Sequence, residues 1–138
     1  IRHPARVIAS YDRKRENPTF ADLGLQRQFT LLEQCYTFGE APIVIDCDDI
    51  LKNPEGMVRS LCIDLDIKFD FNMLTWQSGP RPEDGVWAQH WYDRVHQSTG
   101  FGDAPSALPD VSKKLMNLMD DAMPIYTAMA QRKILPVM

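Results

Sequence analysis

The clearest periodic pattern of apolar residues lies over Ala21–Phe38. The apolar side chains recur three or four residues apart, at Leu25, Phe29, Leu32 and Tyr36. This spacing places them on one face of an α-helix. Gly39 follows, and a glycine directly after the last apolar position is typical of a left-handed helix end. The pattern therefore predicts a helix over Ala21–Phe38 with a broad buried face.

The same reasoning predicts further helices on both sides of this one. Asn53 followed by Pro54 is a strong helix start, because asparagine caps the first turn and proline tolerates the first helical position. A proline inside a helix bends it, and we expect this at Pro124. The other predicted helices are Pro4–Arg15, ended by Asn17 and Pro18, then Trp87–Gln97 and finally Asp110–Arg132.

Pro42–Asp46 is the one segment with the pattern of a buried strand, a short continuous apolar run rich in β-branched residues. A single strand between several helices indicates an α/β fold dominated by helices. The length of 138 residues fits one domain over residues 1–138.

Charge and hydropathy narrow the classes of partner. The net charge is −4, from 15 basic and 19 acidic residues. There is thus no basic surface of the kind that nucleic acids require, and an anionic partner would have to be bound by a small local cluster. No apolar run approaches the roughly 20 residues that cross a bilayer. We therefore expect a cytoplasmic protein that binds neither nucleic acid nor membrane.

The amino-terminal segment carries the most specific chemistry. Arg2 leads directly into a helix that starts at Pro4, and Ser10 follows Arg2 by eight positions. An arginine at a helix entrance can bind phosphate through two parallel charged hydrogen bonds. The alternative is that Arg2 pairs with a carboxylate and that Ser10 simply occupies a helix interior.

This spacing resembles the 3′-phosphate-binding segment of the sulfotransferases. The resemblance implies a sheet-and-helix scaffold related to the P-loop nucleotide kinases. It also implies that Arg2 and Ser10 bind the 3′-phosphate of the sulfonate donor, 3′-phosphoadenosine 5′-phosphosulfate. Trp91–Phe101, together with Met73–Trp76, resembles a branch of sulfotransferase-like proteins found beside aminotransferase-like domains.

The segment from Arg81 to Trp91 resembles the loop that closes over the same phosphate in that family. Gly85 and Trp87 match the pattern of glycine, variable residue and tryptophan, and Arg81 precedes them. By resemblance, Arg81 and Gly85 are further donor-binding candidates. Alternatively, Trp87 and Trp91, one helical turn apart, anchor a mobile loop through apolar contacts.

The strand ending in Asp46 resembles the family strand that ends in an acidic pair. Asp46 and Asp48 could ligate a divalent metal, but carboxylates at a strand end more often cap the following turn, so we assign no metal site. The unevenly spaced histidines, among them His90 and His96, are interpreted as structural.

Sulfonate transfer also needs a loop for the donor's 5′-phosphosulfate and a base for the acceptor hydroxyl. The sequence contains no Gly-x-x-x-x-Gly-Lys segment and no residue matching the family's catalytic positions. We therefore assign no catalytic residue and leave enzymatic activity open. We expect the chain to be the carboxy-terminal portion of a sulfotransferase fold, with the P-loop half located elsewhere. This portion alone is expected to be inactive. The alternative is a non-catalytic helical module for packing or association, and a hydrolase using Asp46 and Asp48 ranks third. In either main case we expect a homo-oligomer or a separate amino-terminal half, and an acceptor that the sequence does not identify.

Overall fold

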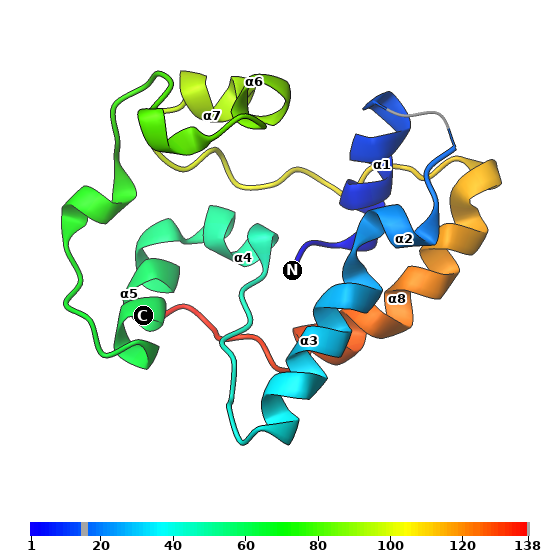
Figure 1. The fold of residues 1–138 in the computed structure, drawn as a ribbon, viewed down its shortest axis with the longest axis horizontal. Coiled ribbons are helices and arrows are strands. Elements are labelled where there is room, and N and C mark those ends of the chain that lie inside the picture. Colours follow the sequence, from blue (N-terminus) through cyan, green and yellow to red (C-terminus); the bar gives the residue numbers. More distant parts are fainter. Residues whose placement is uncertain (15–16, 138) are drawn as a thin grey trace.

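The computed structural model describes residues 1–14 and 17–137, and most of its regular structure is helical (Figure 1). The helices are α1 (Pro4–Lys14), α2 (Phe20–Leu23), α3 (Leu25–Thr37), α4 (Cys47–Lys52), α5 (Pro54–Asp64), α6 (Ala88–Trp91), α7 (Asp93–Gln97) and α8 (Met116–Ala130). Short 3₁₀ turns cover Phe71–Leu74, Pro82–Asp84 and Lys113–Leu115. None of the described helices is long and apolar enough to cross a membrane.

The core lies where α8 packs against α1, α2 and α3. It is built from apolar side chains of these four helices, of the 3₁₀ turn before α8 and of the extended segment after α3, namely Ile8, Leu23, Leu25, Leu32, Val44, Leu115, Ala122 and Met129. Leu25 and Leu32 belong to the periodic pattern that predicted the helix over Ala21–Phe38, and both are buried. Phe29 is partly buried, but Tyr36, the last position of the predicted face, is 42% exposed, so the predicted face packs only as far as Leu32.

The predicted helix over Ala21–Phe38 is interrupted at Gly24. Gly24 has φ +70°, a left-handed conformation, and it ends α2 and begins α3. Glycine adopts this conformation without the steric cost that a Cβ brings. The prediction of one continuous helix is wrong at this point, although the apolar periodicity continues across it.

The other predicted helices differ mainly at their ends. Helix α1 begins at Pro4 as expected, and the predicted last residue, Arg15, lies outside the described residues. The range 87–97 forms two short helices, α6 and α7, and α8 begins only at Met116 and continues through Pro124. Helix α5 has the predicted cap, because Asn53 Oδ1 accepts a hydrogen bond from the Gly56 amide at 2.9 Å.

The predicted strand over Pro42–Asp46 does not form within the described residues, whereas the prediction of a mostly helical fold is confirmed there. Val44 forms one isolated parallel bridge with Lys133. On the other side, the Ile1 nitrogen donates to the Ile45 carbonyl at 2.5 Å. The segment is extended, but within the described residues these contacts stay isolated, and a strand needs a neighbouring ladder. The described fold is a helical assembly.

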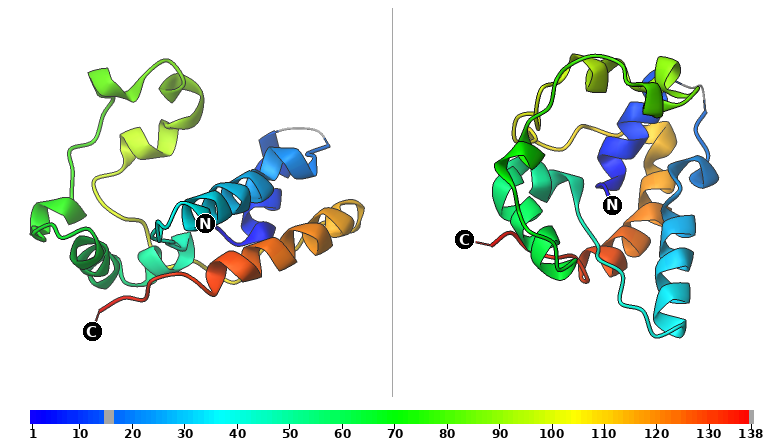
Figure 2. Two further views of the ribbon diagram at one scale, coloured as in Figure 1. Left: turned by 60° about the horizontal axis from the view of Figure 1, so that its bottom comes forward. Right: turned by 60° about the vertical axis from the view of Figure 1, so that its left-hand side comes forward.

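The carboxy-terminal tail joins the helical core to a second group formed by α4 and α5 (Figure 2). Ser60 on α5 is buried and donates its hydroxyl to the Leu135 carbonyl at 2.7 Å, while the Val137 amide donates to Ser60 Oγ at 2.9 Å. One serine thus satisfies two backbone groups of the tail. Beyond α5, the chain forms a long arc over residues 65–112 that contains α6 and α7 and returns to α8 (Figure 2).

Candidate functional site

The candidate anion site begins at the entrance to α1. Arg2 lies two residues before the buried Pro4, and its side chain is exposed. Its guanidinium has no hydrogen bond or ion pair with any residue that the structure describes, so the carboxylate partner of the alternative interpretation is not seen there. Ser10 lies half-buried on α1, and its hydroxyl likewise has no partner among these residues. Both groups therefore keep hydrogen-bonding capacity for a ligand.

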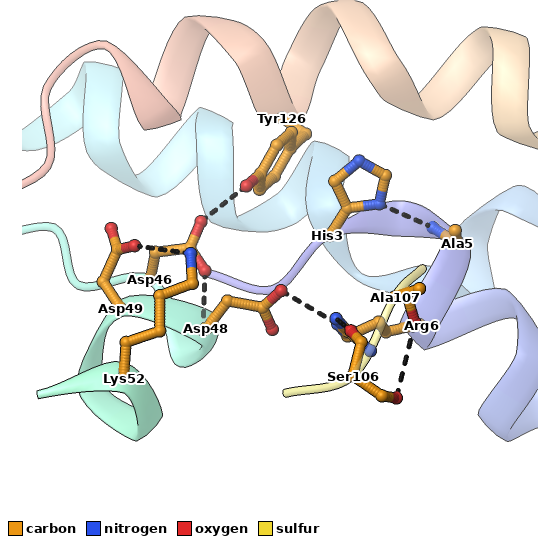
Figure 3. Close-up of polar contacts among 10 residues, drawn as sticks. All are labelled: His3, Ala5, Arg6, Asp46, Asp48, Asp49, Lys52, Ser106, Ala107 and Tyr126. Carbon is orange, nitrogen blue, oxygen red and sulfur yellow. Dashed lines mark hydrogen bonds and ion pairs between the residues drawn. The ribbon is translucent and has the colours of Figure 1, made fainter. Parts of the chain in front are cut away.

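A polar cluster fixes the start of α1 against α4 and the returning arc (Figure 3). Arg6 Nε lies 2.9 Å from Asp48 Oδ2, and the side chains are only 13% and 17% exposed. Arg6 Nη2 also donates to the Ser106 carbonyl at 2.6 Å. Arg6 lies in the first turn of α1, four residues after Arg2, so this contact holds the helix start that follows Arg2.

Asp46 links the same cluster to α8. It is 1% exposed, and Tyr126 donates its hydroxyl to Asp46 Oδ2 at 2.5 Å (Figure 3). Asp46 Oδ1 accepts the Asp48 amide at 2.9 Å, which caps α4. Asp46 therefore caps the next helix, as the alternative to a metal site stated. Within residues 1–14 and 17–137, no three His, Cys, Asp or Glu side chains gather in a way that could hold a metal ion.

Charges on α4 are balanced by lysines. Asp49 Oδ2 lies 2.5 Å from Lys133 Nζ, and Lys52 Nζ lies 3.5 Å from Asp49 Oδ1. Burial opposes ionisation of Asp49, but Lys133 and Lys52 together outweigh it, so the pKa of this carboxyl is lowered. Asp48 Oδ1 is buried without a hydrogen bond from the described residues. These groups line a cavity of about 370 Å³ beside residues 105–108.

The pKa values of two further side chains in the cluster, His3 and Tyr126, are shifted. Burial lowers the pKa of His3, although Asp48 and Asp46 pull it upward. The His3 ring meets the Tyr126 ring edge to face, with the centroids 5.1 Å apart. Burial, reinforced by the hydrogen bond to Asp46, raises the pKa of Tyr126 strongly. At neutral pH both rings are therefore uncharged, and the cluster is held by its carboxylates and cations.

The second pair of predicted site residues, Arg81 and Gly85, lies on the arc beside α7. The Arg81 amide donates to Asp84 Oδ2 at 2.8 Å, and His96 Nε2 lies 2.9 Å from the same oxygen. These contacts lower the pKa of Asp84, the Arg81 amide contributing most. Gly85 has φ +71°, the left-handed region. A carboxylate thus fixes this turn, while the Arg81 side chain stays exposed.

The contacts of this loop also bear on the alternative interpretation of its tryptophans. Trp87 is 71% exposed, and its ring meets His90 with the centroids 6.5 Å apart. It is therefore not a buried anchor within the described chain. No described hydrogen bond, ion pair or cavity joins Arg81 and Gly85 to Arg2 and Ser10, so the two predicted pairs occupy separate elements.

The sequence reasoning missed the residues that hold α1 in place. Arg6 has a local signal, because it lies one helical turn from Ser10 on the helix that starts at Pro4. Tyr126 has none, because it lies 80 residues away from Asp46 along the chain. Such a contact arises only from the packing of α8 against α1 and the segment before α4.

Comparisons with known proteins were made for the whole chain. Residues 1–133 match the family model described as "Sulfotransferase domain". The chain is 38% identical over 126 residues to branched-chain-amino-acid aminotransferase-like protein 1 of Arabidopsis thaliana, an alignment that covers 91% of this chain. It is 37% identical over 127 residues to the aminotransferase-like protein 2 of the same plant. The chain spans 22% of the length of each relative. No solved structure matches the chain significantly.

Proposed function

Because this chain belongs to the sulfotransferase domain family, we propose that it forms the 3′-phosphate side of a site for 3′-phosphoadenosine 5′-phosphosulfate. Sulfotransferase domains generally use this nucleotide as the sulfonate donor. In this proposal, Arg2 and Ser10 bind the 3′-phosphate. The observation that carries it is the Arg2 guanidinium, which is exposed and unpartnered among the described residues at the entrance of a firmly held helix.

Preorganisation of the backbone beside Arg2 favours phosphate binding. An arginine can form two parallel hydrogen bonds to a phosphate, but the gain is reduced if the backbone must first be ordered. Here Pro4 is buried, and the salt bridge of Arg6 to Asp48 ties the first turn of α1 to α4. The hydroxyl of Ser10 adds a neutral donor on the same helix. Together they supply one charged and one neutral contact to a phosphate.

We assign Arg81 and Gly85 to a loop that closes over the bound nucleotide. Asp84 and His96 fix the turn that carries Arg81, and the guanidinium itself points to no described partner. No described contact joins this loop to Arg2. The assignment therefore requires the loop to contact the nucleotide on the side opposite Arg2. It is therefore tested separately, through Arg81→Ala.

The donor's 5′ side is assigned to residues outside this sequence. A phosphosulfate is normally cradled by a glycine-rich loop with a lysine, and this sequence contains no such motif. The single domain proposed here over residues 1–138 would then supply part of a composite site. Alone, it binds the nucleotide without transferring the sulfonate.

One observation favours a second function as an association module. Several large apolar side chains are strongly exposed, among them Phe38 at 82%, Val86 at 78% and Leu135 at 68%. Exposed apolar side chains mark an interface where they form a contiguous patch, and self-association would cover them. Sedimentation of the chain over a range of concentrations tests this function. A constant monomer mass would exclude self-association.

Calorimetric titration with adenosine 3′,5′-bisphosphate tests the proposed donor site. Adenosine 5′-monophosphate is the control ligand, because it lacks only the 3′-phosphate. We expect the bisphosphate to bind more tightly and Arg2→Ala to remove this preference. Arg27→Ala, which removes an exposed arginine on α3, is the matched control and is expected to keep it. Equal binding of the two nucleotides, or equal effects of the two substitutions, would refute the proposal.

A further inference from the structure

A second cavity lies on the arc, away from Arg2 and Ser10. It has a volume of about 280 Å³ and lies between residues 72–84 and α7. Its lining includes Asn72, Thr75, Trp76, Gln77, Arg81 and His96. Pockets for drug-sized ligands begin at about 300 Å³. This cavity is slightly smaller, so it has room for a single ring only.

The aromatic wall of the cavity is held in a fixed orientation. Trp76 donates its indole N–H to Ser98 Oγ at 2.9 Å. Its ring also meets Phe101 edge to face, with the centroids 5.5 Å apart. The backbone beside it is fixed by the antiparallel bridge of Thr75 with Gly100. The indole is thus preorganised, and a ligand would not have to order it.

The polar side chains of the lining can bond to a ligand, and the lining has little net charge. The side chains of Asn72, Thr75 and Gln77 have no hydrogen-bond partner in the part of the chain that the structure describes. Each can both donate and accept a hydrogen bond. The lining carries one carboxylate, Asp84, and one guanidinium, Arg81, so its formal charges balance. Asp84 Oδ2 accepts the Arg81 backbone amide and lies 2.9 Å from His96 Nε2. The cavity therefore offers paired donors and acceptors rather than a net charge.

We propose that this cavity binds one ring of a sugar or a similar polyhydroxylated ligand. Sugar hydroxyls both donate and accept, as do the two amides and the threonine hydroxyl around them. The C–H face of a sugar ring is apolar and suits the indole of Trp76. A phenol has a single hydroxyl and would use few of these donors and acceptors. A phosphate would have to lie beside the Asp84 carboxylate.

This inference does not depend on the proposed donor site. Gln77 and Asn72 have no role in that site, and the cavity is tested without any nucleotide. Arg81 belongs to both proposals and is therefore left unchanged. A failure of nucleotide binding and a failure of sugar binding are then separate results.

The test is a titration of the isotope-labelled chain, followed by the nuclear magnetic resonance signal of the Trp76 indole N–H. Trp76→Phe assigns this signal, and glucose, galactose and N-acetylglucosamine are the probes. Phenol and inorganic phosphate are the comparison ligands. Gln77→Ala and Asn72→Ala remove exposed side chains of the cavity, and Gln26→Ala removes an exposed glutamine on α3 as the matched control.

We expect at least one sugar to shift the Trp76 signal to saturation. Gln77→Ala and Asn72→Ala should each weaken binding about fivefold, which corresponds to the loss of one net hydrogen bond. Gln26→Ala should bind the sugar as the unsubstituted chain does. The proposal is overturned if no sugar shifts the signal, if phenol or phosphate binds more tightly, or if both cavity variants bind like the control.

Discussion

Replacing Arg6 by alanine is expected to destabilise the fold more than replacing any exposed cation. The Arg6 and Asp48 side chains are 13% and 17% exposed, and their atoms lie 2.9 Å apart. Asp48 Oδ1 already lacks a described hydrogen-bond partner. Arg6→Ala would therefore leave a poorly solvated carboxylate without its cation, and it would also release the Ser106 carbonyl.

The expected cost follows from burial. Removing one partner of a buried ion pair costs about 3–5 kcal/mol, because the other charge stays buried. The pair retains some contact with water, so we expect the lower end, about 3 kcal/mol. A chain of this length has a free energy of unfolding of about 7–20 kcal/mol, so the variant should still fold.

Urea unfolding followed by circular dichroism measures this cost. The matched control is Lys114→Ala, since the ion pair of Lys114 with Asp12 is 60% and 33% exposed. Exposed pairs contribute about 0.2–1 kcal/mol. A double variant, Arg6→Ala with Asp48→Asn, should be at least about 1 kcal/mol more stable than the sum of the single effects. If Arg6→Ala and Lys114→Ala cost the same within error, the polar cluster does not hold α1.

Three further substitutions test other parts of the structure. Ser60→Ala should lower the free energy of unfolding by about 2 kcal/mol, because it removes the hydroxyl that serves Leu135 and Val137; Ser78→Ala, an exposed control, should change it little in the same urea assay. The pKa of Tyr126 is raised above its ordinary value of 10.0, so the folded chain keeps this proton while the unfolded chain loses it. Stability should therefore fall as the pH rises above about 10, and melting temperatures of Tyr126→Phe should show a smaller fall; equal profiles would contradict the shift. The pKa of His3 is lowered from 6.5 by burial, so the unfolded chain takes up this proton first as the pH falls. Stability should decline below that pH, and His3→Gln should flatten the decline whereas His90→Gln, at an exposed position, should not.

Local features of the fold could be predicted from the sequence. The cap at Asn53 depends only on atoms within the next three residues, and the predicted cap is confirmed. The buried positions of α3 follow from a spacing that the helix geometry imposes. Gly24 also carried a local signal, since a glycine inside a helical pattern weakens the prediction of one continuous helix.

Features that depend on distant partners could not be predicted in the same way. The β-branched run at 42–46 has the composition of a strand, but pairing needs a neighbour, and Lys133 supplies only one bridge. The family assignment is confirmed, because residues 1–133 match the model of the sulfotransferase domain. The bonds of Arg6 to Asp48 and Tyr126 to Asp46 join elements more than 40 residues apart, so no local pattern indicated them.

The central claim is that this domain binds the 3′-phosphate of the donor nucleotide through Arg2 and Ser10. Phosphorus nuclear magnetic resonance of adenosine 3′,5′-bisphosphate tests it directly, because the two phosphates give separate signals. We expect addition of the chain to shift the signal of the 3′-phosphate much more than that of the 5′-phosphate. Arg2→Ala and Ser10→Ala should each reduce the shift of the 3′ signal. Equal shifts of both signals, or a 3′ shift that survives both substitutions, would contradict it.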